Sequence, residues 1–134
     1  MGAALEIIEP CSFPLTDRSL KRAALDYGGH AEVFAHTSWT DFLAAEQRKA
    51  GRLVLFTTHG ARPFIDFAFA AGDTLLFGRE SAGVPGEVHA AADTRLLIPM
   101  AAGTRSLNVV AAAAMALSEA LRQTNGFSRT LPAR

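Results

Sequence analysis

The sequence predicts a single α/β domain with an open, mostly parallel sheet and helices on both faces of that sheet. Short continuous apolar runs bounded by turn residues recur along the chain, and such runs are typical of strands buried on both faces. Segments with helical spacing lie between these runs, and strands that alternate with helices indicate a parallel sheet. The chain has 134 residues, of which 49% are hydrophobic, which is enough for one core without disulfides or metal ions.

The first half of the chain contains two predicted strands and two predicted helices. Each helix follows residues that favour an N-cap, and a glycine follows each predicted helix. The second helix carries the spacing of a capping box, with an aspartate three residues after a serine. In order, the expected elements are strand Leu5–Ile8, a helix from Asp17 to Leu25 after the N-cap candidates Thr16 and Asp17, strand Ala31–Ala35 after Gly28 and Gly29, and a helix that starts at Ser38 and Asp41, carries Trp39, Phe42 and Leu43 on one side, and extends to about Ala50 before Gly51.

The second half repeats the alternation and ends in a long helix. Each apolar run again lies between turn signals, and prolines favour the start of two short helices. The expected elements are strand Leu53–Phe56, a short helix Pro63–Phe67, strand Thr74–Phe77, a short helix Pro85–Ala91, strand Arg95–Ile98, and a last helix whose buried face contains Leu107, Val110, Ala111, Ala114, Leu117, Ser118 and Leu121. We expect one domain over residues 1–124 and a loose tail over residues 125–134.

Composition excludes several classes of protein. The 13 basic and 13 acidic residues give a formal net charge of zero, so nucleic acid would have to be bound by a local patch rather than by a generally basic surface. Cys11 is the only cysteine, and with no cysteine pair and no leader-like N-terminus we expect a cytoplasmic protein. The longest apolar stretch, Val109–Leu117, is much shorter than the ~18 residues that a membrane span requires.

In an open parallel sheet, ligands bind where the strands end, so three loops are candidates for a site: residues 57–60, 78–85 and 99–108. The loop from Gly78 lacks the middle glycine of a dinucleotide-binding motif and the Lys-Ser/Thr of a P-loop. Its spacing around Ser81 is also wrong for a nucleophile elbow, which argues against a hydrolase with His59 or His89. The four histidines are too scattered for a metal site, so we expect none.

Two of these loops carry a family resemblance. Residues 76–85, Leu-Phe-Gly-Arg-Glu-Ser-Ala-Gly-Val-Pro, resemble the F-G-x-E-x-x-G-L/V-P motif of the SPOUT family of RNA methyltransferases. Ile-Pro-Met at 98–100, followed by Arg-Ser-Leu-Asn at 105–108, resembles the last motif of that family. Further matches, such as Ile-Ile-Glu-Pro at 7–10 and Phe-Thr-Thr-His-Gly at 56–60, indicate the TrmL (YibK-like) group of tRNA 2'-O-methyltransferases that modify the wobble nucleotide.

The resemblance implies an α/β sheet whose C-terminal part forms a deep trefoil knot, an exception to the rule that chains are unknotted. It implies S-adenosylmethionine (SAM) as the methyl donor, the tRNA anticodon arm as substrate, and a homodimer. A glycine at position 78 would let the cofactor lie against the main chain, because a Cβ there would intrude. By position, the implied cofactor-binding residues are Phe56, Thr57, Gly78, Ile98, Ser106 and Leu107.

The resemblance also implies a reaction centre around Glu80, Ser106 and Asn108. A ribose hydroxyl would attack the donor's methyl group in line, with catalysis mainly by positioning and by removal of the hydroxyl proton. Two simpler interpretations stay open. Glu80 could be a buried carboxylate that ties its own loop together through hydrogen bonds, and Asn108 could cap the first turn of the last helix.

The chain departs from the family pattern in two places. The family begins with a strand and a helix bearing P-x-N-T-G-N-x-x-R, whose arginine is held to assist deprotonation, and the first strand here matches the family's second. In the last helix, Val110, Ala111 and Ser118 replace polar residues of the family. Three interpretations follow: an ordinary methyltransferase that starts upstream of Met1, a SAM-binding, RNA-contacting module that is catalytically impaired, or a SPOUT enzyme with an altered substrate or an Arg105-based mechanism.

A basic helix face is the candidate for RNA binding. Arg18, Lys21 and Arg22 lie at positions i, i+3 and i+4 of the helix expected over 17–25, so their side chains share one face. Such a face suits the phosphates of an anticodon arm, although spacing alone fits a solvated helix surface equally well. The family match at Leu20-Lys21-Arg22-Ala23 favours RNA.

Overall fold

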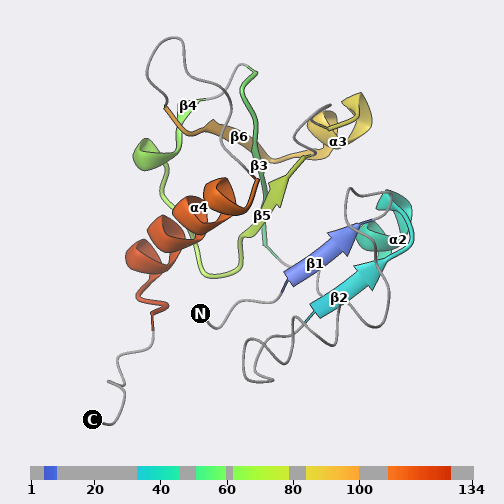
Figure 1. Ribbon diagram of the computed structural model, residues 1–134, viewed down its shortest axis with the longest axis horizontal. Helices are drawn as coiled ribbons and strands as arrows, with labels where there is room; N and C mark the ends of the chain where they lie inside the picture. Colours follow the sequence, from blue (N-terminus) through green and yellow to red (C-terminus); the bar gives the residue numbers. More distant parts are fainter. Residues whose placement is uncertain are drawn as a thin grey trace, which may run out of the picture. The chain divides into compact units, whose positions relative to one another are not determined.

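The structure is a computed structural model that describes residues 5–8, 33–45, 51–59, 62–78, 84–99 and 109–127. Its contacts divide the chain into two compact units, residues 1–49 with 128–134 and residues 50–127, and each unit contains a sheet of its own (Figure 1). The helix expected over residues 17–25 lies outside the described residues. The single domain over 1–124 and the tail over 125–134 remain predictions.

The described residues of the first unit form two parallel strands and a short helix. Strand β1 (Leu5–Ile8) matches the expected strand, and it pairs in parallel with β2 (Val33–His36) from Leu5 opposite Val33 onwards. The second strand therefore extends one residue beyond the expected end at Ala35, because the parallel register continues to the pairing of Ile8 with His36. Across the pair, His36 Nε2 lies 3.0 Å from Glu6 Oε1.

Helix α2 (Trp39–Ala44) begins where the sequence predicts and ends earlier. The Asp41 N–H donates to Ser38 Oγ at 3.1 Å, as a capping box requires, but the Asp41 carboxylate accepts from the Thr37 hydroxyl instead of closing on Ser38. The expected extension to Ala50 is wrong, because Ala45 takes an extended backbone conformation with ψ of 140°. Phe42, only 1% exposed, anchors the helix.

The second unit is a four-stranded sheet in the order β4-β6-β3-β5, and every pair in it is parallel. Strands β3 (Leu53–Phe56) and β5 (Thr74–Phe77) have the expected bounds. Strand β6 (Thr94–Leu97) is one residue out of step with the predicted Arg95–Ile98. The parallel pairings, with helix α3 (Gly86–Ala91) connecting β5 to β6, confirm the α/β fold class.

The edge strand β4 (Arg62–Pro63) is a departure from the sequence prediction, in which Pro63 starts a helix. An edge strand tolerates proline because no N–H donor is needed on the side of the strand that faces away from the ladder. The chain becomes helical immediately afterwards, in the single 3-10 turn η2 (Phe64–Asp66), and Phe67 ends the turn with an extended backbone. The predicted helix over 63–67 is therefore shorter and tighter than expected.

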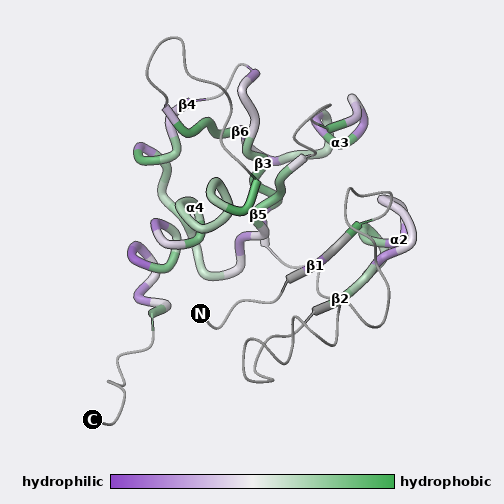
Figure 2. Tube along the Cα trace, viewed as in Figure 1, coloured by the Kyte–Doolittle hydropathy of each residue, from purple (hydrophilic) through white to green (hydrophobic). Residues whose placement is uncertain are grey.

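The core of this unit lies between the sheet and helix α4 (Val109–Thr124). All four residues of β3 are buried, as a strand covered on both faces requires, and Figure 2 shows hydrophobic residues concentrated along the central strands. One face of the sheet packs against a cluster of phenylalanines and against α4, which contributes Ala116 at 0% exposure. The predicted buried face of this helix is wrong: Val110, Ala111, Ala114 and Ser118 are exposed, and the side that packs on the sheet contains Ala116 and Ala120, because the long-range packing decides which side of the helix is covered.

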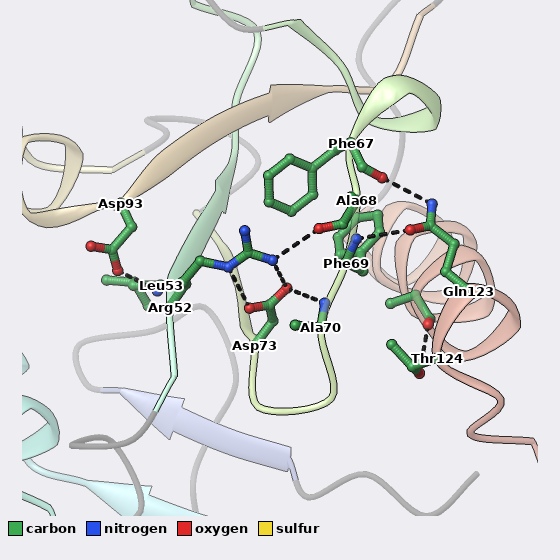
Figure 3. A network of polar contacts seen from close by, with 11 residues as sticks. Arg52, Leu53, Phe67, Ala68, Phe69, Ala70, Asp73, Asp93, Gln123 and Thr124 are labelled. Carbon is green, nitrogen blue, oxygen red and sulfur yellow. Dashed lines mark hydrogen bonds and ion pairs between the residues drawn. The ribbon is translucent and has the colours of Figure 1, made fainter.

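Polar side chains fix the segment between η2 and β5 (Figure 3). Arg52 donates Nε and Nη2 to the Asp73 carboxylate at 2.8 and 2.7 Å, and Nη2 also donates to the carbonyl of Ala68. From α4, the Gln123 amide accepts from the N–H of Phe69 at 2.8 Å and donates to the carbonyl of Phe67 at 2.9 Å. The segment is thus held from the start of β3 and from the last turn of α4.

Candidate functional site

Three parallel strands end side by side, and their carboxyl ends form one edge of the sheet, which is distinct from the edge strand β4. Phe56 at the end of β3 lies opposite Phe77 at the end of β5, and it also lies opposite Leu96 near the end of β6. The residues that follow these ends include Thr57, Gly78 and Ile98, three of the predicted cofactor-binding positions. The register therefore brings the loops that start at 57, 78 and 98 to the same edge, as the sequence predicts.

Thr57 continues the sheet by one residue and then turns the chain away. Its N–H donates to the carbonyl of Leu96 at 2.8 Å, and its hydroxyl oxygen accepts from the N–H of His59 at 3.2 Å. The hydroxyl oxygen acts as an acceptor in that turn, so the O–H group can still donate a hydrogen bond to a ligand. Thr57 is half-buried at the edge where the strands end.

An aromatic stack supports the same edge from within the sheet. The rings of Phe56 and Phe77 are stacked, with centroids 4.9 Å apart and planes 16° apart, and the Phe64 ring meets Phe56 edge-on at 6.3 Å. Phe56 is 8% exposed, so it belongs mainly to the core. Gly78, half-buried, follows Phe77 directly, and the stack therefore fixes the backbone from which Gly78 continues.

The SpoU rRNA Methylase family model matches residues 1–118 of the chain. The chain belongs to this family. A tRNA (cytidine(34)-2'-O)-methyltransferase of Ancylobacter novellus is 50% identical over 97% of the chain and 82% of that relative. A solved structure described as giving insights into the 2-OH methylation of C/U34 on tRNA is 40% identical, covers 92% of this chain and 80% of its own, and has a TM-score of 0.78. The SpoU methyltransferase AviRb from Streptomyces viridochromogenes in complex with AdoMet is 28% identical, covering 91% of this chain and 50% of its own, with a TM-score of 0.75.

As a SpoU methylase, the chain is a methyltransferase, and the family that the two strand-end motifs indicate is confirmed. The structure brings four predicted cofactor-binding residues, Phe56, Thr57, Gly78 and Ile98, to one edge of the sheet. Their role in binding a cofactor stays a prediction. The expected knot is also untested, because the loops from 79 to 83 and from 100 to 108 lie outside the described residues.

The predicted reaction centre and RNA-binding face fall in undescribed parts of the chain. They comprise the catalytic candidates Glu80, Arg105, Ser106 and Asn108, the cofactor candidate Leu107, and the basic residues Arg18, Lys21 and Arg22. Ser81, the nucleophile of the rejected hydrolase, lies there too. Their proposed roles therefore depend on the family motifs and on the strand ends from which their loops start.

The departures from the family pattern on α4 are described by the structure. Val110 is 65% exposed, and Ala111 and Ser118 are also exposed, so none of these replacements fills the core. Next to Ser118, the Arg122 guanidinium donates two hydrogen bonds to Glu119 and, with a further bond from Gln123, lowers the pKa of that carboxyl to about 2. The exposed face of this helix is thus apolar near its start and carries an ion pair near its end.

The two histidines of the rejected hydrolase occupy different settings. His89 Nδ1 accepts from Arg95 Nε at 3.0 Å, and the carbonyl of His89 accepts from the same guanidinium, so this residue ties α3 to β6. His59 is exposed in the turn after Thr57. Within the described ranges, no three His, Cys, Asp or Glu side chains gather in a way that could hold a metal ion.

The polar contacts that hold the site's scaffold could not be predicted from the sequence. Gln123 and the Arg52–Asp73 pair bind backbone groups of residues 67–70, and Gln123 and Arg52 both lie far from that segment in the sequence. The only local signal is a glutamine in the last turn of an amphipathic helix.

Among the helices that the structure describes, none is long and apolar enough to cross a membrane.

Proposed function

We propose that this chain is a SAM-dependent methyltransferase that methylates the ribose 2'-hydroxyl of the wobble nucleotide, cytidine or uridine 34, of tRNA. The observation that carries the proposal is 50% identity, over 97% of the chain, to a tRNA (cytidine(34)-2'-O)-methyltransferase. A second such enzyme, from Beijerinckia indica, is 47% identical over 99% of the chain. Because tRNA is the substrate, we assign the protein to the cytoplasm.

The cofactor site that we propose lies at the strand ends. Backbone N–H and C=O groups that leave a parallel sheet suit a ligand with an adenine, a ribose and an amino-acid part, and Phe56 supplies an apolar wall. Thr57 offers a hydroxyl donor, and Gly78 leaves room beside the main chain. Ile98, Ser106 and Leu107 complete the proposed lining. Bound there, SAM supplies a methyl group on a positively charged sulfur.

The remaining chemistry falls to residues of the two loops. The site must hold the ribose hydroxyl in line with the methyl group and accept the proton that the hydroxyl loses. We assign these tasks to Glu80, Arg105, Ser106 and Asn108, which lie in the family's motifs after the ends of β5 and β6. A carboxylate near the hydroxyl fits the proton acceptor, and the serine and asparagine side chains fit hydrogen bonds that orient the ribose.

A homodimer is part of the proposal. The family resemblance implies one, and α4 presents an exposed surface that suits close packing of a second copy. Its exposed residues include Val110 at 65%, Met115 at 43% and the small residues Ala111 and Ala114. Small side chains on a helix allow two backbones to approach closely, and the exposed apolar groups around them favour burial.

The test is complementation of a bacterial strain that lacks its own wobble-cytidine 2'-O-methyltransferase. Expression of this chain should restore 2'-O-methylcytidine at position 34, measured by mass spectrometry of nucleosides from purified tRNA. A catalytically impaired, SAM-binding module would bind SAM in calorimetry without restoring the modification. Absence of both SAM binding and modification, from a folded protein, would overturn the proposed function.

The basic helix face is tested through salt dependence. Alanine at Arg18, Lys21 and Arg22 together should weaken tRNA binding and reduce the slope of log K against log salt by about 2 to 3, since each phosphate contact contributes ~0.7 to 0.9. Fluorescence anisotropy with labelled tRNA over a potassium chloride series gives that slope. Arg122→Gln serves as the control, because the Arg122 guanidinium is already paired with Glu119. An unchanged slope in the triple variant would remove this assignment.

A further inference from the structure

One arginine differs from the others that the structure describes. The guanidinium of Arg52 is paired with Asp73, that of Arg122 with Glu119, and that of Arg95 with the ring and carbonyl of His89. Arg62, which is exposed, has no hydrogen-bond acceptor among the described residues, and its contact there is with the ring of Phe67. Within the part of the chain that the structure describes, nothing compensates its positive charge or occupies its N–H donors, which suits it to a ligand.

The Phe67 ring contacts that guanidinium and favours one orientation of it. Arg62 Cζ lies 5.2 Å from the ring centroid, within the range of a cation–π contact. The ring is itself fixed, because Phe67 is 5% exposed within the phenylalanine cluster and Gln123 binds its carbonyl. Arg52 contacts the same ring at 4.7 Å, but its charge is compensated by Asp73. The ring thus orients a cation that no carboxylate of the described residues compensates, so less side-chain entropy is lost when a ligand binds.

The register places Arg62 in line with the proposed cofactor site. Arg62 lies opposite Leu96, Leu96 lies opposite Phe56, and Phe56 lies opposite Phe77, so the four residues form one row across the sheet. Neighbouring strands are ~4.8 Å apart, which puts the backbone of Arg62 about 10 Å from that of Phe56. Arg62 therefore stands on the edge strand, beside the strand ends where we place the reaction.

We propose that Arg62 binds a phosphodiester of the tRNA substrate and helps to position the strand at the site. This inference rests on the proposed function. A guanidinium with free N–H groups matches the oxygens of a phosphate, and the charge-assisted hydrogen bonds that form are stronger than neutral ones. Arg62 lies about 10 Å from the strand ends. A phosphate bound there would fix the position of the wobble nucleotide in the site, and Arg62 would not touch the reacting atoms.

The experiment compares Arg62→Met with wild type, using the full chain and unmodified tRNA. Methionine keeps an unbranched side chain over the Phe67 ring and removes only the charge and the donors. Removing one phosphate contact should reduce the slope of log K against log salt by about 0.7 to 0.9, so the loss of affinity at 50 mM salt should exceed that at 200 mM about threefold. KM for tRNA should rise, whereas the affinity for SAM and the melting temperature stay unchanged. Arg62→Lys should restore the slope, and Arg122→Gln should match wild type.

Three results would overturn the inference. The first is a slope and a KM for tRNA that do not change in Arg62→Met. The second is a fall in SAM affinity, which would mean that the guanidinium serves the carboxylate of the cofactor instead. The third is a lower melting temperature with an unchanged slope, which would make Arg62 a cover for the aromatic cluster. If wild-type protein neither binds nor methylates tRNA, the proposed function itself fails, and that result is distinct from the other three.

Discussion

Gly78→Val should abolish binding of SAM while the protein remains folded. Gly78 follows Phe77 at the end of β5, where the stack of Phe77 on Phe56 fixes the backbone, with the two ring centroids 4.9 Å apart. A branched Cβ at that point would occupy the space in which the cofactor lies against the main chain. Isothermal titration calorimetry should detect heat with wild type and none with the variant.

The matched control is Gly86→Val. Gly86 is exposed at the start of α3, and a Cβ added there meets no atom within 4 Å. This variant should bind SAM with the affinity of wild type. Circular dichroism of Gly78→Val should show the wild-type spectrum and a melting temperature within a few degrees. SAM binding by a folded Gly78→Val variant at wild-type affinity would contradict the position that we assign to the cofactor.

Gly51→Ala should lower the stability of the fold by about 2 kcal/mol or more. Gly51 precedes β3 with φ of 80°, a left-handed conformation that glycine adopts readily and alanine does not. A Cβ at this position would also lie 1.8 Å from the carbonyl oxygen of Gly72, so one of the two backbones would have to move. That movement would strain the Arg52–Asp73 pair, since each partner is adjacent to one of the two glycines.

Thermal or urea unfolding followed by circular dichroism measures the effect of Gly51→Ala. We expect the melting temperature to fall by more than about 5 °C. Gly86→Ala is again the control and should change the melting temperature little, because its Cβ enters open space. If Gly51→Ala had the melting temperature of wild type, the turn before β3 would have to have another accessible conformation.

The strands were the most predictable part of the fold. Leu5–Ile8, Leu53–Phe56 and Thr74–Phe77 have the bounds that the sequence predicts, because a continuous apolar run between turn residues is a local signal. Local signals failed where packing decides. Ala45 suits a helix by propensity yet is extended, and β4 exists only because Arg62 and Pro63 meet Leu96 and Leu97, more than 30 residues later.

The position of the candidate site could be predicted from the sequence, but the contacts that support it could not. Parallel strands place their carboxyl ends at one edge, so the loops after Phe56 and Phe77 could be paired from the sequence pattern alone. The contacts that support them could not be predicted in this way. The bonds from Gln123 to Phe67 and Phe69 span 56 and 54 residues, and no local pattern encodes such a distance.

The strand order has a consequence for synthesis on the ribosome. Strand β3 lies at the centre of its sheet, between β5 and β6, and both partners follow it in the chain. The Leu53 N–H donates to the Asp93 carboxylate, 40 residues further on, so about 2 to 8 s of translation separate the two at 5 to 20 residues per second. Until Thr74–Phe77 is made, about halfway through that interval, the four apolar residues of β3 have neither neighbour, and afterwards they still lack β6. The nascent chain is therefore most exposed to aggregation and to chaperones after β3 has emerged and before β6 has joined it.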